Sequence, residues 1–402
     1  MSEGRRRFLR RARDLLGTLA GGLCASNVRA DDSRQPGALG APVTGYGERS
    51  RFERSARWVN PARYAVSTGS CTPLGELDGV VTPSALHYER HHAGVPAINP
   101  ALHRVLVHGL VQRPLEFTMD ALRRFPSASR LCFLECSGNS WREWPAAAGE
   151  NVQQTHGLTS CSEWTGVLLK DVLAECGIGS AARWIVAEGG DGARLTRSVP
   201  LDKCQDDVLL AYAQNGEALR PEQGYPVRLL VPGYEGSISV KWLTRIKVTD
   251  TPYYSREETS KYTDLMPDGR ARAFTLLMDA KSVITSPSPR AHALARGFNE
   301  IRGLAWSGRG RIARVEVSVD DGAHWQDATL HGPVLPVCHT RFTLPWRWQG
   351  AATVISSRCH DETGYVQPTR AALVAARGTH SFYHYNGIQR WRIASDGSVH
   401  NV

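Results

Sequence analysis

The sequence lacks several features that would place it at once in a common class of protein. None of its nine cysteines is spaced Cys-x-x-Cys, which excludes a zinc ribbon and also the Cys-x-x-Cys-His motif that attaches a c-type haem. No internal repeat and no glycine-rich nucleotide-binding motif occur. A dense disulfide scaffold is not expected either, because a chain of 44.2 kDa can form a stable hydrophobic core without disulfide bonds. One or two surface disulfides remain open.

The net charge of +9 is concentrated at the N-terminus. Residues 1–30 contain seven arginines against Glu3 and Asp14, which accounts for +5 and leaves +4 for the rest of the chain. Such a small remainder gives little support to nucleic acid as a partner. The apolar run 15–24 is too short to span a bilayer, so no membrane span is expected.

The arginines at the N-terminus have a more specific interpretation. Arg5-Arg6-Arg7-Phe8-Leu9, the short apolar run and the small-residue site Val28-Arg29-Ala30 predict a twin-arginine signal peptide over residues 1–30. The alternative is a basic disordered tail. A twin-arginine signal directs export of an already folded protein, so we expect a periplasmic location and a cofactor loaded before export.

The rest of the N-terminal part changes from irregular to periodic sequence. Residues 31–85 predict an extended arm, with ordered structure beginning near Leu86. Residues 86–280 predict strands at 105–110, 130–135, 182–187, 208–212, 227–231 and 242–248, and helices at 118–125, capped by Thr118, and at 166–176, ended by Gly177. Because the helices are few and short, we expect a mixed α+β architecture and not a doubly wound sheet.

The character of the sequence changes again near Ser286-Pro287-Ser288-Pro289. Strands are expected at 301–306, 312–319 and 352–358, with Asp320-Asp321-Gly322 as a hairpin turn. Strands about ten residues apart predict an immunoglobulin-like β-sandwich, assigned to residues 281–378. Residues 379–402 are predicted to form a polar and aromatic tail.

The stretch Leu134–Trp141, LECSGNSW, places a cysteine at the expected end of a strand. In extended backbone Cys132 and Cys136 lie on one face about 13 Å apart, which is too far for a disulfide or a shared metal ion. Cys136 is then a nucleophile, a single soft metal ligand or a packed thiol. The small residues Ser137-Gly138-Asn139 let a bulky group approach, and no Cys-His signature accompanies His156, so a ligand to a cofactor metal is favoured.

Several segments in a fixed order carry a resemblance to a known family. They are Tyr88-Glu89-Arg90-His91-His92, Glu135-Cys136-Ser137-Gly138-Asn139, 153–164 (QQTHGLTSCSEW), 224–228 (GYPVR), 240–242 (VKW) and 256–262 (REETSKY). Over nearly the whole mature chain the sequence resembles the sulfite oxidase family of molybdenum enzymes, and within it the molybdenum subunits of sulfane dehydrogenases. The resemblance implies a molybdopterin-binding domain at 86–280, followed by an immunoglobulin-like dimerisation domain at 281–378.

The resemblance also implies roles for individual residues. Cys136 matches the cysteine that binds molybdenum beside the pterin dithiolene, and Arg90 matches an arginine that faces the anionic substrate with a planar, permanently charged fork. Tyr262 falls at an active-site tyrosine, although Lys-Tyr-Thr surrounds it here instead of Asp-Tyr-Lys. The remaining matches are cofactor-binding positions: Tyr88, Glu89, Arg90, His91, His92, Asp191, Gln223, Arg228, Ser239, Val240 and Lys241.

Some of these positions have a plainer interpretation from the residues alone. Without the resemblance, 227–231 is a core strand, Lys241 a solvated charge and Arg90 a partner in a surface salt bridge. Gln223 also departs from the family, because the sulfite oxidases have a cofactor-contacting histidine there; a side-chain amide can still hydrogen-bond at that place.

One departure concerns the substrate. Vertebrate-type sulfite oxidases continue after the cysteine with Ala-Gly-Asn-Arg-Arg, whereas this chain has Ser-Gly-Asn-Ser-Trp-Arg. Trp141 therefore replaces a pocket arginine, with Arg142 beside it. We expect a less cationic and more aromatic pocket, which suits a larger sulfur substrate, such as a persulfide on a carrier protein, better than free sulfite.

The resemblance implies molybdenum-dependent oxygen-atom transfer to reduced sulfur. Because neither a haem-attachment motif nor a cytochrome b5-like region occurs, electrons are expected to pass to a separate c-type cytochrome subunit. The sandwich is expected to form a homodimer. Residues 381–387 either cover the active-site entrance, bind the cytochrome or pack on the sandwich as the end of a strand. The alternatives are a sulfite:cytochrome c dehydrogenase of the same fold and, from another class, a periplasmic binding or adhesion protein in which Cys136 is only packing.

Overall fold

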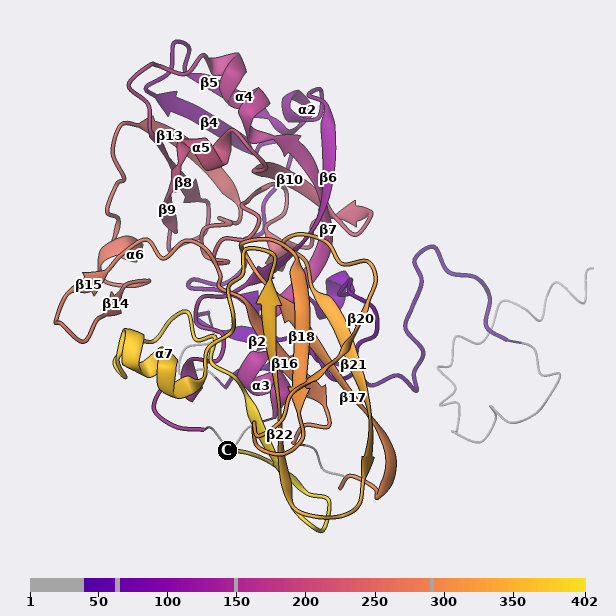
Figure 1. Cartoon of the computed structure of the whole chain (residues 1–402). Coiled ribbons are helices and arrows are strands. Elements are labelled where there is room, and N and C mark those ends of the chain that lie inside the picture. Colours follow the sequence, from indigo (N-terminus) through magenta and orange to yellow (C-terminus); the bar gives the residue numbers. More distant parts are fainter. Residues whose placement is uncertain (1–39, 62–65, 148–150, 290–292) are drawn as a thin grey trace, which may run out of the picture. The chain divides into compact units, whose positions relative to one another are not determined.

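The computed structural model describes residues 40–61, 66–147, 151–289 and 293–402 (Figure 1). The chain divides into two units, residues 1–54 and 55–402. Residues 40–54, the described part of the first unit, contain no helix or strand. The predicted twin-arginine signal at 1–30 lies outside the described residues. In the part of the chain that the structure describes, no helix is both long and apolar enough to cross a membrane.

Residues 55–280, here called the mixed region, contain three main sheets. The first joins β1 (Trp58–Val59), β2 (Gly69–Cys71) and β3 (Glu89–Arg90). The second has the order β11-β10-β7-β6, with β12 also paired to β10, and the third has the order β5-β4-β13-β8-β9. Their bounds are β4 (Arg104–Gly109), β5 (Leu115–Thr118), β6 (Ser127–Glu135), β7 (Thr159–Leu168), β8 (Trp184–Gly189), β9 (Thr196–Pro200), β10 (Leu209–Gln214), β11 (Glu217–Ala218), β12 (Arg228–Leu230) and β13 (Leu243–Thr249).

Short helices and one small hairpin complete the mixed region. The hairpin pairs β14 (Asp264–Leu265) with β15 (Ala271–Arg272). The helices are η2 (Ser84–Leu86), α2 (Met119–Leu122), η3 (Trp141–Glu143), α3 (Val152–His156), α4 (Leu169–Cys176), α5 (Leu201–Cys204), η4 (Pro221–Gln223) and α6 (Arg256–Thr259). At the start of α2 the Thr118 side chain accepts a hydrogen bond from the backbone N–H of Ala121, as the predicted cap requires.

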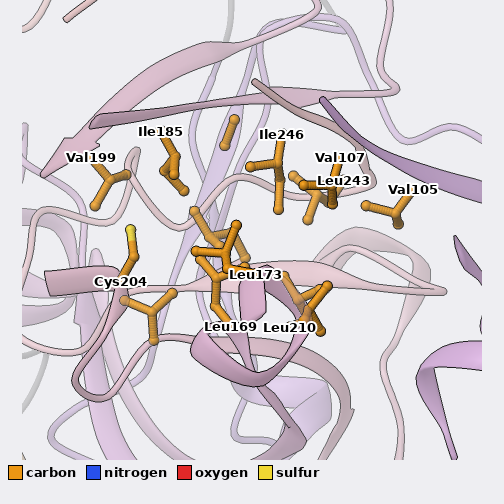
Figure 2. Close-up of a cluster of buried hydrophobic side chains, with 14 of the residues drawn as sticks. Val105, Val107, Leu169, Leu173, Ile185, Val199, Cys204, Leu210, Leu243 and Ile246 are labelled. Carbon is orange, nitrogen blue, oxygen red and sulfur yellow. The ribbon is translucent and has the colours of Figure 1, made fainter. Parts of the chain in front are cut away.

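The core of the mixed region forms where α4 packs between sheets. Leu169 and Leu173 of α4 face side chains from β8, β9 and β13, including Ile185, Val199 and Ile246 (Figure 2). All five side chains are buried. Along β4 burial alternates, with Val105 and Val107 inside, so a period of two in the sequence produces one apolar sheet face.

Residues 281–402, here called the sandwich region, form two sheets around a second core. One sheet has the order β16-β17-β21-β20 and the other the order β19-β18-β22-β23-β24. Their bounds are β16 (Lys281–Ser286), β17 (Gly297–Trp306), β18 (Ile312–Ser318), β19 (Gln326–Asp327), β20 (Thr329–His331), β21 (Thr340–Trp348), β22 (Thr353–Asp361), β23 (Arg390–Ile393) and β24 (Val399–Asn401), and α7 (Arg370–Arg377) lies before β23. The predicted combination of a mixed α+β region and a β-sandwich is confirmed.

Three expectations about individual segments are wrong. Residues 166–168 are not helical, because Val167 and Leu168 pair with Leu210 and Leu209 of β10 and continue β7. Ordered packing begins well before Leu86, because Cys71 is buried in β2. The segment 379–402 is not only a tail, because β23 and β24 extend a sandwich sheet to Asn401. In all three cases pairing with distant strands decides the outcome.

A buried ion pair joins the two regions beside Cys136. Glu135, the last residue of β6, accepts hydrogen bonds from Lys281 Nζ at 2.9 Å, from Trp306 Nε1 at 2.7 Å and from Asn139 Nδ2 at 2.9 Å. The side chains of Glu135 and Lys281 are 0% and 1% exposed. Since two partners come from the sandwich region and one from the loop after Cys136, this carboxylate ties the loop to the sandwich.

Replacing Lys281 by Met leaves Glu135 as a buried charge without its countercharge. We expect Lys281→Met to lower the free energy of unfolding by about 3–5 kcal/mol, measured by urea unfolding with tryptophan fluorescence. The matched control is Lys170→Met on α4, where the lysine is only half-buried and the change should stay below about 1 kcal/mol. Equal midpoints for the two variants would show that the pair does not stabilise the junction.

Candidate active site

One cavity gathers most of the residues that the sequence predicts for the site. The space inside it, together with the part open to solvent, is about 660 Å³. The predicted residues that line it are Tyr88, Glu89, Arg90, His91, His92, Cys136, Asp191, Gln223, Arg228, Ser239, Lys241 and Tyr262. Val240 is not among them, because its side chain is buried in the core of the mixed region.

Cys136 is held at the cavity by the turn that ends β6. Its backbone N–H donates to Leu158 O at 2.9 Å, and its carbonyl accepts from the N–H of Asn139 at 2.8 Å. Burial raises the pKa of the Cys136 thiol, while a backbone hydrogen bond from Gly138 and the charge of Arg90 oppose the rise. A bound cation is therefore needed to hold this sulfur as a thiolate at neutral pH.

Lys241 brings a half-buried positive charge to the cavity without a hydrogen-bonded carboxylate. Its Nζ contacts Arg90 O at 3.2 Å, Glu222 O at 3.0 Å and His91 Nδ1 at 2.9 Å. Burial, reinforced by the charge of Arg228, lowers the pKa of Lys241 well below its usual range. A cation with only neutral partners is costly to bury, so this position favours an anionic ligand.

Arg228 is a second cation at the cavity, and its hydrogen bonds also go to neutral groups. Its guanidinium donates to the carbonyls of Gln223 at 3.0 Å and Ser239 at 2.8 Å, and it lies 5.1 Å from the ring centroid of Trp164. Burial lowers the pKa of Arg228 to about 10. Together with Lys241, this arginine makes one wall of the cavity strongly electropositive, which suits a phosphate group.

His91 is fixed between a cation and an anion. Its Nδ1 faces Lys241 Nζ, and its Nε2 lies 2.6 Å from Glu89 Oε2. Because the ammonium group can only donate, Nδ1 accepts and Nε2–H donates to the carboxylate. The pKa of Glu89 is lowered to about 2 even though burial opposes the shift, because His91 and Arg57 stabilise the carboxylate.

Arg90 and Tyr262 line the cavity together with His92. The Arg90 guanidinium donates to Thr68 O at 3.3 Å and also to His91 O. The Tyr262 hydroxyl lies 3.0 Å from His92 Nε2. Burial and the charge of Arg90 lower the pKa of His92 to about 4, so this ring is neutral at pH 7 and orients the phenol without adding charge.

Two further predicted residues are tied to the cavity wall by hydrogen bonds. Gln223 donates from Nε2 to Tyr88 O at 2.9 Å. Its amide therefore connects η4 to the residue that precedes β3. Asp191 accepts at Oδ1 from the N–H of Leu195 at 3.4 Å. Both residues are buried, which places them where a bound cofactor is enclosed by protein.

The sequence did not reveal a buried charge network behind Tyr262. The guanidinium carbon of Arg197 lies 4.7 Å from the Tyr262 ring centroid, and Arg197 Nη2 binds Glu235 Oε1 at 2.5 Å. Oε2 of Glu235 lies 3.3 Å from His384 Nε2, without hydrogen-bond alignment. Burial alone would raise the pKa of Glu235, but Arg197 and His384 lower it. Since arginines are rarely buried, nothing in the sequence of β9, TRSVP, indicated that Arg197 is buried.

Aromatic rings lead from the surface to the cavity. Trp141, which is 41% exposed, stacks on Phe382 with centroids 4.8 Å apart. Phe382 contacts Tyr383 at 5.0 Å, and Tyr383 contacts Tyr262 at 5.0 Å. Trp141 thus lies at the mouth of the site and not in the cavity wall. Phe382 and Tyr383 of the segment 381–387 lie between Trp141 and Tyr262, which agrees with the predicted role of this segment as a cover of the entrance.

The residues present fit a molybdenum cofactor. Among the described residues, no three His, Cys, Asp or Glu side chains are grouped closely enough to hold a metal ion themselves. Cys136 can supply one soft ligand to a metal that a cofactor brings, and the wall formed by Lys241 and Arg228 can hold an anionic group. Gly236 is also required beside the cysteine, because a Cβ there would lie 2.6 Å from the Tyr88 hydroxyl and 2.8 Å from Glu135 O.

Comparisons with known proteins agree with this fit. Residues 92–257 match the family model "Oxidoreductase molybdopterin binding domain", and residues 272–390 match "Mo-co oxidoreductase dimerisation domain". The chain is 36% identical over 346 residues to a nitrate reductase [NADH] of Hordeum vulgare and 33% identical over 325 residues to the mitochondrial sulfite oxidase of Mus musculus. Each match covers 74% of this chain but only 37% and 59% of the relatives, so the chain spans less than two thirds of their length.

A solved structure resembles the chain over nearly its full length. The sulfane dehydrogenase SoxCD from Paracoccus pantotrophus matches with a TM-score of 0.89 and 46% sequence identity, covering 92% of this chain and 98% of that one. The resemblance inferred from the sequence is thereby confirmed. The chain belongs to the sulfite oxidase family of molybdopterin-binding oxidoreductases.

Proposed function

We propose that the chain is the molybdenum subunit of a sulfane dehydrogenase, which oxidises a sulfane or persulfide sulfur carried on a protein and passes the electrons to a c-type cytochrome subunit. The observation that carries this proposal is the run of rings from Trp141 to Tyr262 at the mouth of the cavity. The similarity to the SoxCD chain supports it over nearly the whole sequence.

In this proposal the cofactor is bound from two sides. Cys136 ligates molybdenum through its sulfur, while Arg228, Ser239 and Lys241 hold the pterin and its phosphate. The hydrogen-bonded pair of His91 and Glu89 fixes the position of the Lys241 ammonium group in the cavity wall. When bound, the cofactor supplies oxygen-atom transfer to sulfur, with electrons removed one at a time afterwards.

The chain's own residues bind and orient the substrate. Arg90 attracts the anionic sulfur with its planar, positively charged guanidinium. Tyr262, oriented by neutral His92, donates a hydrogen bond at the reacting face. Tyr383 and Phe382 cover this face from the tail, which excludes water and leaves an apolar approach for a peptide that carries the sulfur.

The charge around the site favours a carrier-bound sulfur over free sulfite. Trp141 occupies the sequence position of a pocket arginine, and the positive charge of Arg197 is already offset by Glu235 at 2.5 Å. A small dianion therefore finds fewer uncompensated cations here. The second candidate, a sulfite:cytochrome c dehydrogenase, keeps the same cofactor and differs only in the substrate that gives high turnover.

Location and assembly complete the proposal. The twin-arginine signal expected at 1–30 supports a periplasmic enzyme that is exported folded with its cofactor. Because the sequence contains no haem-attachment motif, a separate c-type cytochrome accepts the electrons. The match of residues 272–390 to a dimerisation domain supports a homodimer formed through the sandwich region.

Cys136→Ser tests the metal site. We expect about one molybdenum per chain in the wild type and a loss of at least about tenfold in the variant, because a hydroxyl is a poor substitute for a soft thiolate. Metal analysis by mass spectrometry after gel filtration gives the content. Cys132→Ser, in β6 four residues before it, should keep the metal. If both variants retain molybdenum equally, Cys136 is not its ligand.

Lys241→Met separates cofactor binding from folding. We expect cofactor content to fall about tenfold or more, whereas the variant prepared without cofactor should melt about 2 °C or more above the equally prepared wild type, because a buried cation with neutral partners is removed. Since the pKa of Lys241 is lowered in the folded state, the unfolded chain binds more protons, so wild-type stability rises with pH and the difference shrinks toward pH 10.

Lys247→Met, on β13 shortly after Lys241, is the control for this variant and should leave cofactor content unchanged. A Lys241→Met protein that retains the cofactor fully would contradict the assigned role of the lysine.

Trp141→Arg tests the substrate. We expect the wild type to turn over a protein-bound persulfide at least about tenfold faster than free sulfite, and the variant to gain about tenfold in kcat/KM for sulfite, because one charged contact with an oxyanion has about this value. Reduction of cytochrome c gives the rate. Arg142→Gln is the control. Equal wild-type turnover with free sulfite alone would favour the sulfite dehydrogenase.

A further inference from the structure

Two cysteines from different regions of the fold meet in the interior, away from the cavity. Cys161 lies on β7 of the mixed region, and Cys338 lies just before β21 of the sandwich region. Their Sγ atoms are 3.3 Å apart, and the residues are 0% and 1% exposed. Of the eight cysteines in the described part of the chain, no others approach within sulfur–sulfur contact.

Hydrogen bonds fix the backbone at Cys161. Its N–H donates to Thr82 Oγ1 at 3.2 Å, and its carbonyl accepts from the N–H of Thr82 at 2.7 Å. In the β6–β7 ladder Cys161 also stands opposite Phe133. The backbone of Cys161 is therefore fixed by β6 on one side and by the loop residue Thr82 on the other.

The residues that flank Cys338 are fixed to the same two strands. Val337 O accepts from the N–H of Phe133 at 3.0 Å, and His339 Nε2 lies 3.0 Å from Thr159 Oγ1. The His339 ring also stacks on Phe133, with centroids 6.0 Å apart and an interplanar angle of 13°. Cys338 thus lies in a short segment that is pinned before and after it, so the contact with Cys161 is imposed by the fold.

We propose that Cys161 and Cys338 are a redox-active pair that closes into a buried disulfide and covalently joins the mixed and sandwich regions. A disulfide bond is about 2.05 Å long, so the sulfur atoms need to approach by about 1.2 Å from their separation of 3.3 Å. Side-chain rotation over such a distance leaves the two backbones in place. The bond would close a loop of 177 residues, a length at which a cross-link restricts the unfolded chain strongly.

Burial determines which oxidant can reach the pair. A protein oxidant cannot touch sulfurs that are this deeply enclosed, so the oxidant in this proposal is a small peroxide. The Cys338 thiolate attacks the peroxide, the O–O bond breaks, and a sulfenic acid and water are produced once the hydroxide is protonated; Cys161 sulfur then displaces a second water. Two thiols and one hydrogen peroxide thus give one disulfide and two waters. Donation from Cys161 lowers the pKa of Cys338, which favours this order of attack.

The experiment maps thiols in the complete, cofactor-loaded protein. Samples treated with a slight excess of hydrogen peroxide or with dithiothreitol are denatured in N-ethylmaleimide, weighed intact and digested. We expect the oxidised protein to carry two fewer labels, a cross-linked peptide pair containing Cys161 and Cys338, and a melting temperature about 5 °C higher. Dithiothreitol should reverse all three changes.

Cys161→Ala and Cys338→Ala should each abolish the cross-linked peptides and the thermal shift, whereas Cys204→Ala, at another buried cysteine, should keep both. Full labelling of Cys161 and Cys338 after peroxide treatment, or their oxidation to sulfinic acids without cross-linking, would overturn the proposal. The readout is independent of substrate, so the proposed enzymatic function can fail while the disulfide forms, and the reverse.

Discussion

The carboxylate of Glu135 is the constraint on which the rest of the site depends. It is fully buried, and it is satisfied by a lysine and a tryptophan from the sandwich region and by an asparagine from the cysteine loop. Burying a carboxylate without such partners is energetically costly. The loop that presents Cys136 is therefore correctly placed only when β16 and β17 of the sandwich are docked, so the second domain is part of the architecture of the site.

Other contacts also connect the loop that carries Cys136 to the C-terminal part of the chain. His384 donates its backbone N–H to Ser137 O at 2.7 Å, directly beside Cys136. Arg370, at the start of α7, donates to the carbonyls of Glu143 and Trp144, which follow the cysteine loop. Ser140, Tyr262 and His384 all have positive φ angles, which non-glycine residues hold only where surrounding contacts determine the backbone. The geometry around the thiol is thus maintained by residues more than a hundred positions away.

How much of this was visible in the sequence follows from the range of the interactions. Alternating apolar residues such as Val105 and Val107 predicted strands correctly, because that pattern is local. The helix predicted to begin at 166 begins at Leu169 instead, because Val167 and Leu168 pair with β10 and form strand. The family resemblance identified most of the residues that line the cavity, although Val240 points into the core instead. Arg197 and Glu235 were missed because a buried charge cannot be inferred until its partner, 38 residues away, is known.

The distribution of compensated and uncompensated charge separates two ends of the site. Lys241 and Arg228 are buried against carbonyl and imidazole groups, so their positive charge is available to an anionic cofactor. Arg197, nearer Tyr262, is balanced by Glu235 and adds little field toward a substrate. At that end the approach is lined by Trp141, Phe382 and Tyr383. A free dianion gains most from unpaired cations, whereas a sulfur on a peptide carrier gains from apolar and aromatic contact. The arrangement of charge therefore favours the carrier-bound substrate for the same reason that it favours an anionic cofactor at the opposite wall.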